Sequence, residues 1–250
     1  MLTDNSNVAL FGYTKNATIK NFKLNANFKA TKGSVAGVVD YATDTSIINV
    51  QATGSLEVSN KENKLASMGG IVGHLVSGNN IVDSCISSQT FEVPGGNKTA
   101  VGGIVAQIES GCKNTVVSNC SNTANLASNR EKTGFIALDD YDWCGGIVGK
   151  IDSGGNIDIV KCSNLGSIVG DTAGAIVGFV QALHGNQTYN IVNCDNYGQV
   201  RGDYCAGILG RIYKSSGKAS NTTINLNWCS NYGYVGCIDK KIFCAAGIVG

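Results

Sequence analysis

Proline, charged residues and histidine are scarce in this chain of 250 residues. It has one proline and two histidines, 15% of its residues are charged, and its formal net charge is +1. No stretch concentrates lysine and arginine as nucleic-acid binding requires, so we expect no nucleic-acid partner. The chain has 33 glycines but only one proline, which excludes a disordered chain rich in both residues. Apolar residues make up 43% of the chain, which suffices for a core.

Long apolar runs and a signal peptide are also missing. The longest apolar stretches, such as Ala173–Leu183, are too short to cross a bilayer, so we expect no direct membrane insertion in this segment. The N-terminus has no basic region followed by an apolar one. The chain ends inside its own repeated motif, at Ala246–Gly250. We therefore expect a fragment of a longer protein, with its signal and anchor outside residues 1–250.

Recognised catalytic motifs are absent from the sequence. It has no Gly-x-Ser-x-Gly elbow, no phosphate-binding loop and no dinucleotide fingerprint. The two histidines, His74 and His184, have no nearby serine or cysteine in a recognisable nucleophile context. We therefore expect a protein that is not an enzyme and that needs no cofactor.

A four-residue motif of the type Gly-Ile-Val-Gly recurs along the chain, and we call it the Gly box. The first aliphatic residues of its eight copies, some of them degenerate, are Leu10, Val38, Ile71, Ile104, Ile147, Ile176, Ile208 and Ile248. Successive copies are 28, 33, 33, 43, 29, 32 and 40 residues apart. Self-similarity at such a period is the signature of a repeat protein.

A second motif, Cys-x-Asn-x-Gly, follows the Gly box. Its cysteine position holds Phe22, Val50, Cys85, Cys120, Cys162, Cys194 and Cys229. Three residues before that position the chain has Ile19, Ile47, Val82, Val117, Ile159, Ile191 and Leu226. Six residues after it the chain has Phe28, Leu56, Phe91, Leu126, Ile168, Val200 and Val235. Both columns are apolar in every repeat, so these positions are expected to be buried.

Short apolar segments determine the predicted architecture. They are four to six residues long, rich in valine and isoleucine, and separated by glycine, asparagine and serine, which is typical of strands and turns. None keeps a helical spacing for three turns. One repeat cannot close a core, but parallel stacking about 4.8 Å apart would align equivalent positions and bury them. We therefore predict an all-β fold, a parallel β-solenoid (β-helix) of about eight imperfect coils, forming one domain over residues 1–250.

Two other β architectures fit the repeat less well. A β-propeller needs four strands per blade, and spacings of 28 and 29 residues leave too little chain. A β-sandwich would not keep aligned columns. In a solenoid, the recurring glycine and asparagine would lie at corners, where the backbone often needs positive φ. Aligned asparagines would also form a ladder of amide hydrogen bonds along one corner.

The Gly box followed by Cys-x-Asn-x-Gly, as in Gly146–Gly149 and Cys162–Gly166, resembles the GLUG-type repeats of bacterial cell-surface proteins. The resemblance covers residues 8–250 and is clearest after Gly69. It implies a β-solenoid with an extracellular or cell-surface location. It transfers no catalytic residues to this chain.

Five of the ten cysteines occupy the second motif. Cys144, Cys205 and Cys244 form another set just before the Gly box, where other repeats have Met68 and Val101. Because Phe, Val and Met replace cysteine in these columns, we expect buried free thiols that pack as apolar side chains. Disulfides between neighbouring coils are the alternative, although parallel side chains rarely reach the required torsion. A metal site is less favoured, because no Cys-x-x-Cys pair is present.

An insertion in the longest repeat carries the candidate ligand-binding residues Asp139, Asp140, Tyr141, Asp142 and Trp143. Aromatic side chains offer flat apolar faces to sugars, and clustered carboxylates attract Ca²⁺. We expect no other metal, and the calcium candidate consists of Asp139, Asp140 and Asp142, whose spacing differs from that of an EF-hand loop. The alternative is a solvated loop with its aromatic side chains folded back on the solenoid.

These observations predict a non-catalytic structural or adhesive segment of a secreted or surface-anchored bacterial protein. Any ligand, a glycan or a host surface protein, would bind through projecting loops. The alternative is a carbohydrate-active β-helix enzyme, a polysaccharide lyase or hydrolase, an idea that rests on fold analogy. That alternative requires the three aspartates of the insertion to converge in a groove with a basic residue such as Arg130 or Lys132.

Overall fold

The computed structural model describes residues 7–59, 66–93, 99–127, 142–152, 154–182, 185–214, 220–237 and 244–250. Within these ranges all regular elements are β-strands. The described residues form no helix, and therefore no helix that could cross a bilayer. The strands form sheets of eight, 18 and four strands. Their pairings are all parallel. The predicted all-β class with parallel strands is confirmed, and the arrangement is compatible with a parallel β-solenoid.

Two of the sheets consist of short strands. The eight-stranded sheet contains β1 (Asn7–Val8), β4 (Ser34–Ala36), β7 (Ser67–Gly69), β11 (Ala100–Gly102), β15 (Trp143–Gly145), β20 (Thr172–Gly174), β25 (Tyr204–Ala206) and β30 (Cys244–Ala246). The four-stranded sheet contains β14 (Leu126–Ala127), β19 (Ile168–Val169), β24 (Val200–Gly202) and β29 (Val235–Cys237). Each strand comes from a different sequence repeat, so the repeats stack in chain order.

The 18-stranded sheet continues around the rest of each repeat. Directly after the Gly box lie β2 (Phe11–Lys15), β5 (Val39–Thr43), β8 (Val72–Asp83), β12 (Val105–Ser118), β16 (Val148–Ile151), β21 (Val177–Ala182) and β26 (Leu209–Lys214). The chain then turns back through β3 (Thr18–Ala30), β6 (Ser46–Val58), β17 (Asn156–Val160), β22 (Gly185–Val192) and β27 (Ser220–Asn227). The remaining strands are β9 (Ile86–Ser87), β10 (Thr90–Glu92), β13 (Ser121–Asn122), β18 (Ser163–Asn164), β23 (Asp195–Asn196) and β28 (Ser230–Asn231).

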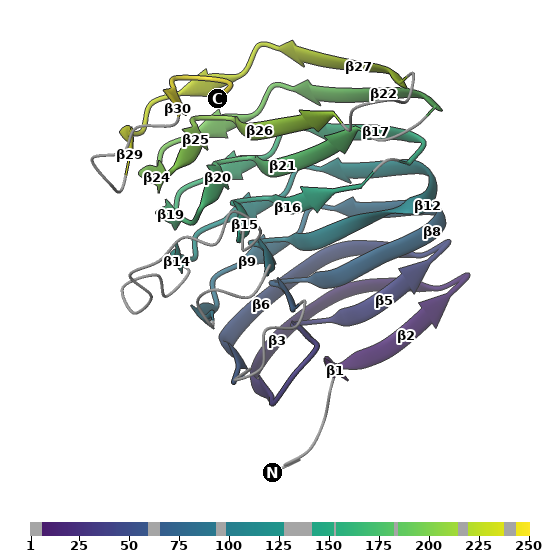
Figure 1. The fold of residues 1–250 in the computed structure, drawn as a ribbon. Coiled ribbons are helices and arrows are strands. Elements are labelled where there is room, and N and C mark those ends of the chain that lie inside the picture. The colour runs from purple at the N-terminus through teal and green to yellow at the C-terminus, as the bar shows by residue number, and fades with distance from the viewer. Residues whose placement is uncertain are drawn as a thin grey trace.

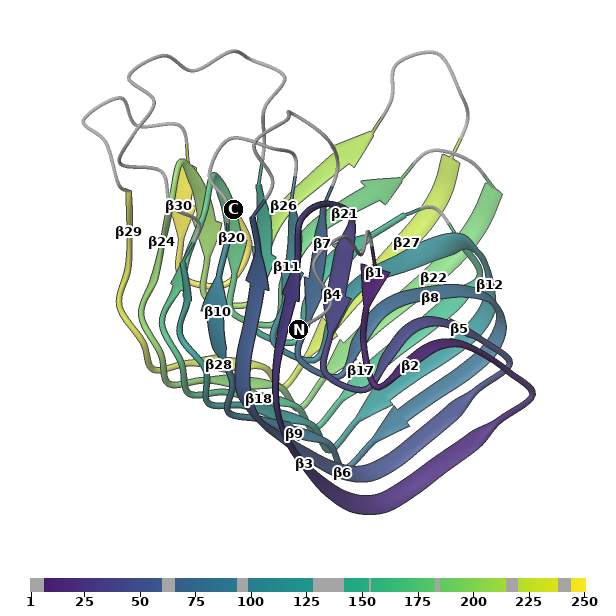
Figure 2. The ribbon, with the colours of Figure 1, turned by 90° about the horizontal axis from the view of Figure 1, so that it is seen from below.

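The stacked strands form two arms that diverge from the Gly box. Figure 1 shows the repeats piled one on another, and Figure 2 shows the two arms nearly end-on. One arm contains the eight- and four-stranded sheets around a core that includes Met68, Leu126 and Ile168. The other arm is made of two layers of the 18-stranded sheet, around a core that includes Ile108 and Ile159. Part of that sheet also reaches the first arm, where Leu56 of β6 and Phe91 of β10 join its core. Because the arms diverge, one face of each borders a shared concave side.

The apolar columns predicted from the sequence lie in register. Ile47 pairs with Ile19 on one side and with Val82 on the other. Val117 continues the same column from Val82 towards Ile159. In the second column, Leu56 pairs with Phe28 and with Phe91. Equivalent apolar residues of successive repeats therefore lie next to one another and bury one another, as parallel stacking requires.

Left-handed backbone recurs at one corner, one residue before the cysteine column. The residues there are Asn21 (φ 61°), Asn49 (φ 53°), Ser84 (φ 54°), Asn119 (φ 51°), Lys161 (φ 54°), Asn193 (φ 53°) and Trp228 (φ 52°). The prediction that the motif asparagines and the Gly-box glycines supply the positive φ was wrong. Gly103 of the Gly box is needed for space instead, because a Cβ there would lie 2.1 Å from the Gly146 carbonyl oxygen. Asparagine suits the left-handed corner because its short side chain tolerates that conformation.

The motif asparagines form the predicted ladder. The Asn122 Nδ2 donates to Asn164 Oδ1 at 2.9 Å, and Asn164 Nδ2 donates to Asn196 Oδ1 at 2.9 Å. Asn196 continues the ladder to Asn231 at 2.7 Å. Each Nδ2 also donates to the carbonyl oxygen two residues ahead, for example to Gly166 at 2.8 Å. The buried amides therefore hold successive repeats together and fix the corner within each repeat.

The cysteine side chains that the structure describes are free thiols. Seven are buried, namely Cys85, Cys112, Cys120, Cys144, Cys162, Cys194 and Cys205. The prediction that Cys144, Cys205 and Cys244 occupy one column is wrong for Cys244. Cys205 pairs with Ala245, whereas Cys244 pairs with Tyr204. One additional residue separates Cys244 from its Gly box, so Ala245 takes the position in register with Cys205.

Thiol reactivity provides a direct check of the buried cysteines. Burial raises the pKa of Cys144, with the Asp142 and Asp171 charges adding to it, and burial raises the pKa of Cys205 to about 11. We expect a thiol reagent to modify at most three of the ten cysteines quickly in the folded protein and all ten in denaturant, because buried thiols rarely form the reactive thiolate. Cysteines that react in denaturant only after addition of a reductant would instead reveal disulfides.

Candidate functional site

The structure describes two of the five predicted site residues, Asp142 and Trp143, and they lie in different surroundings. Asp139, Asp140 and Tyr141 lie outside the described residues, as do Arg130 and Lys132. The Asp142 carboxylate is only 3% exposed, and its Oδ1 accepts a hydrogen bond from the Thr99 backbone N–H at 2.9 Å. Trp143, the next residue, is half-buried and faces the concave side between the arms.

Asp142 belongs to a buried column of aspartates rather than to an open acidic cluster. Its own N–H donates to Asp171 Oδ2 at 3.2 Å, and Asp203 is buried in the following repeat. Among the described residues, no three His, Cys, Asp or Glu side chains are arranged to hold a metal ion. The described part of the insertion therefore supplies hydrogen bonds between repeats.

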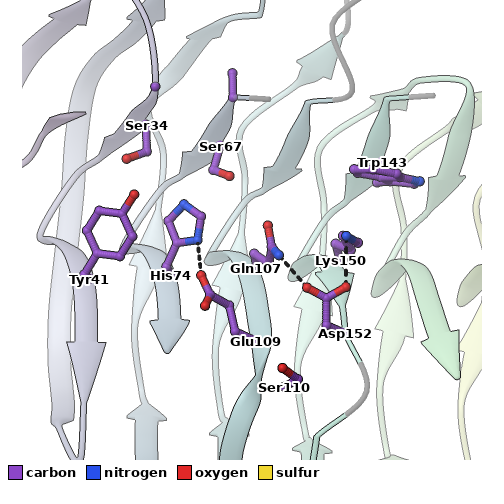
Figure 3. Close-up of a pocket in the computed structure, with 12 residues that line it drawn as sticks. Ser34, Tyr41, Ser67, His74, Gln107, Glu109, Ser110, Trp143, Lys150 and Asp152 are labelled. Carbon is purple, nitrogen blue, oxygen red and sulfur yellow. Dashed lines mark hydrogen bonds and ion pairs between the residues drawn. The ribbon is translucent and has the colours of Figure 1, made fainter. Parts of the chain in front are cut away.

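A pocket of about 360 Å³ lies on the concave side, and we call it the groove. It is lined by Gly33, Ser34, Tyr41, Ala66, Ser67, His74, Gln107, Glu109, Ser110, Trp143, Lys150 and Asp152. Four successive repeats contribute to it, so it runs along the stack (Figure 3). One wall is the eight-stranded sheet, and the other is formed by β5, β8, β12 and β16 with the residues that follow them. The lining combines aromatic rings with hydroxyl, amide and carboxylate groups.

The wall opposite the eight-stranded sheet has one column of variable residues. It runs in register through Tyr41, His74, Gln107, Lys150, Phe179 and Arg211. Each of these residues stands three positions after the first aliphatic residue of its Gly box. Strand residues alternate between the two faces, so this offset places the side chain on the concave side while its neighbours enter the core.

At one end of the groove, three side chains form a connected group. The Tyr41 and His74 rings are stacked, with centroids 4.6 Å apart and 11° between their planes. His74 Nδ1 lies 2.8 Å from Glu109 Oε1. Burial raises the pKa of Tyr41, against a hydrogen bond with Ser34 that lowers it. Tyr41 therefore keeps its proton at neutral pH and can donate a hydrogen bond into the groove.

At the other end, Asp152 connects two neighbouring residues of the column. Its Oδ2 accepts a hydrogen bond from Gln107 Nε2 at 2.6 Å, and its Oδ1 lies 2.9 Å from Lys150 Nζ. The Lys150 ammonium lies 4.5 Å from the centre of the Trp143 ring, a cation–π contact. Phe179 extends the aromatic surface, 5.5 Å from Trp143 between ring centroids. These contacts hold the long side chains in place before any ligand arrives.

Behind the groove lies the buried carboxyl group of Asp40. One of its oxygens accepts a hydrogen bond from Ser34 Oγ, while Oδ2 has no hydrogen-bond partner among the described residues. Burial raises the pKa of Asp40, against the Ser34 hydrogen bond and the nearby His74, which lower it. Other repeats have Gly73 or Ala106 at this position. Asp40 therefore costs stability wherever it is ionised.

We expect Asp40→Asn to be more stable than the parent protein at neutral pH. The folded-state pKa of Asp40 is raised, so the folded state binds its proton more tightly and the parent loses stability as pH rises through that pKa. The variant lacks this loss, and its advantage should shrink as pH falls. Urea unfolding of both proteins across the acidic to neutral range measures the difference. A difference that does not change with pH would contradict the assignment.

The groove residues were not among the predicted site residues, although the sequence carries a signal for them. The position three residues after each first aliphatic residue of the Gly box varies among aromatic, polar and charged types, while its neighbours stay apolar. A variable column inside a regular repeat points to the face that contacts other molecules. The invariant columns, in contrast, form the core.

Comparison with known proteins gave a partial match to Halomucin of Haloquadratum walsbyi. The match is 28% identical over 107 residues, which is 42% of this chain. The chain spans about 1% of the length of that protein. No family model matches the chain, and no solved structure matches it significantly.

Proposed function

We propose that the chain is a parallel β-solenoid of about eight coils, a non-catalytic structural and adhesive segment of a secreted or surface-anchored protein. The in-register stacking of one strand per repeat in the eight-stranded sheet supports the coil number. Such a stack is stiff along its length because each repeat is bonded to its neighbours across several strands. A stiff rod that carries a binding face suits a spacer or an adhesive module.

Two observations support the surface location. The Gly box and the Cys-x-Asn-x-Gly motif resemble GLUG-type repeats, which implies a bacterial cell surface. The partial match to Halomucin, a protein named after the mucins, favours a secreted or surface protein as well.

The groove is the observation that carries the adhesive role. It offers a concave site on a rigid scaffold, and its polar groups converge on one volume, as in ligand sites generally. Its residues lie on paired strands, so they are held more precisely than side chains on loops. The ligand, a glycan or a host surface protein, would therefore bind in the groove rather than through projecting loops alone.

A second candidate function is a carbohydrate-active enzyme, and the His74–Glu109 pair favours it. A histidine oriented by a carboxylate is a common general base, and here it stands beside the hydroxyl-bearing Tyr41 in the groove. Of the three aspartates that the sequence suggested for such an enzyme, Asp142 is buried and accepts a hydrogen bond from the Thr99 N–H, while Asp139 and Asp140 lie outside the described residues.

One experiment separates the two functions. The purified chain is incubated with immobilised host and dietary glycans and host surface proteins, and both retention and release of shorter products are recorded. Retention without products supports the adhesive proposal. Products that disappear in His74→Ala would overturn the non-catalytic part, and failure to retain any ligand would overturn the adhesive part.

A further inference from the structure

The groove walls are sheet faces, not sheet edges. β7 is paired on both sides, with β4 and β11, and β8 is likewise paired with β5 and β12. The backbone groups of these strands are therefore used within the stack, and an extended peptide cannot add to them as a further strand. Recognition in the groove has to come from side chains.

The side chains of the groove match a ligand rich in hydroxyl groups. Tyr41 offers a hydroxyl and Gln107 an amide, while the Ser34 hydroxyl is already bonded to Asp40. Trp143 adds a large ring whose apolar surface suits the C–H face of a sugar. Ala66 is the one aliphatic side chain among the lining residues that the structure describes, so the groove has no pocket for the apolar anchors typical of a protein partner.

The charges of the groove argue against a polyanionic ligand. Lys150 is already paired with Asp152 at 2.9 Å, and His74 is held by Glu109. Two carboxylates therefore line the pocket beside one lysine. A polymer with a carboxylate or sulfate on every unit would meet repulsion from them, whereas a neutral polymer would find hydrogen-bond acceptors.

The shape of the groove favours an extended ligand. Neighbouring strands are about 4.8 Å apart, so the four repeats that line the groove cover roughly 15 Å along the stack. The register column continues beyond the groove through Phe179 to Arg211, whose guanidinium lies over the Tyr204 ring at 4.1 Å. A linear polymer could follow this line of aromatic and polar side chains.

We propose that the groove binds a neutral, extended polysaccharide that lies parallel to the stacking axis, with Trp143 as its main aromatic contact. This inference rests on the adhesive function proposed above and names its ligand class. Tyr41 and Gln107 donate hydrogen bonds to sugar oxygens, and Glu109 and Asp152 accept them from sugar hydroxyls.

The two tryptophans of the chain allow a matched test. Trp143 lines the groove, whereas Trp228 is 81% exposed and lies outside it. The variant Trp228→Phe keeps only Trp143, and the variant Trp143→Phe keeps only Trp228. Each variant is titrated with a soluble neutral mixed-linkage β-glucan, arabinoxylan and galactomannan, and with polygalacturonate as the anionic comparison, while the intrinsic fluorescence is recorded.

The expected result is a saturable emission change in Trp228→Phe with at least one neutral polysaccharide and none in Trp143→Phe. Trp143→Ala should weaken retention of that polysaccharide at least tenfold, and Trp228→Ala should leave it unchanged. Asp152→Asn, a smaller change that keeps the shape, should weaken retention as well, which guards against a folding defect in Trp143→Ala.

Three outcomes would overturn the inference. In the first, the parent protein retains a glycan, and Trp143→Ala and Asp152→Asn retain it equally well. In the second, both tryptophans give an equal fluorescence signal. In the third, the protein binds polygalacturonate in preference to the neutral polysaccharides. The first two would leave the adhesive function standing, with its site elsewhere. Failure of the parent protein to retain any glycan or surface protein would instead remove the adhesive function itself.

Discussion

Replacing Asn164 with alanine should destabilise the fold by about 4 kcal/mol, because each buried hydrogen-bonding group left unpaired costs about 1–3 kcal/mol. Asn164 is fully buried in the middle of the amide ladder. Its Oδ1 accepts from Asn122, and its Nδ2 donates to Asn196 and to the Gly166 carbonyl. Alanine removes all three bonds and leaves the partners without water to replace them. Urea unfolding followed by circular dichroism measures the loss.

Asn221 provides the matched control for this prediction. It donates to Asn186 Oδ1 at 3.0 Å, which is the same type of contact between neighbouring repeats, but both side chains are exposed. Water replaces the lost bond in Asn221→Ala, so we expect a loss below about 1 kcal/mol. Equal losses in the two variants would show that burial of the ladder is not what makes it important.

Replacing Ile147 with alanine is expected to cost roughly 3 to 4 kcal/mol, since truncating a fully buried isoleucine removes apolar contacts and leaves a cavity. Ile147 has no exposed surface, and its backbone bonds to Ile104 and Ile176 place it between the same positions of the two adjacent repeats. These neighbours are fixed by their own strands, so they cannot collapse into the space. Denaturant unfolding again provides the measurement.

The control for Ile147 is Ile81, an isoleucine in β8 that is 40% exposed. Ile81→Ala removes the same atoms from a strand, but it opens no enclosed cavity, so we expect a loss below about 1 kcal/mol. A loss at Ile147 no larger than that at Ile81 would mean that the Gly-box column does not form the tightly packed core described here.

The core could be predicted from the sequence because parallel stacking requires an apolar residue at the same position of every repeat. Ile47, Val82 and Val117 are equivalent in the repeat and pair in register, and the aligned motif asparagines form the expected ladder. A buried position tolerates few residue types, so the same type recurs and the alignment reveals it. Parallel pairing then follows from geometry.

Other features escaped the sequence because they depend on local offsets or on three-dimensional shape. One extra residue before the last Gly box puts Ala245, not Cys244, in register with Cys205, which a motif alignment does not show. The left-handed corner includes Lys161 and Trp228 beside asparagines, so its residue type alone is a poor signal. The groove exists only because the two arms diverge, and no local pattern encodes that angle.

The stacking also determines how the chain would respond to tension. The first and last strands lie at opposite ends of the stack, so a pull along its length would load the hydrogen bonds between repeats (Figure 1). A terminal repeat would peel away while the rest stayed folded, since each repeat contacts mainly its neighbours. About 30 residues would be released each time, or roughly 100 Å of extended chain. A stack under tension would therefore lengthen in steps, and each step would dissipate part of the work done on the chain.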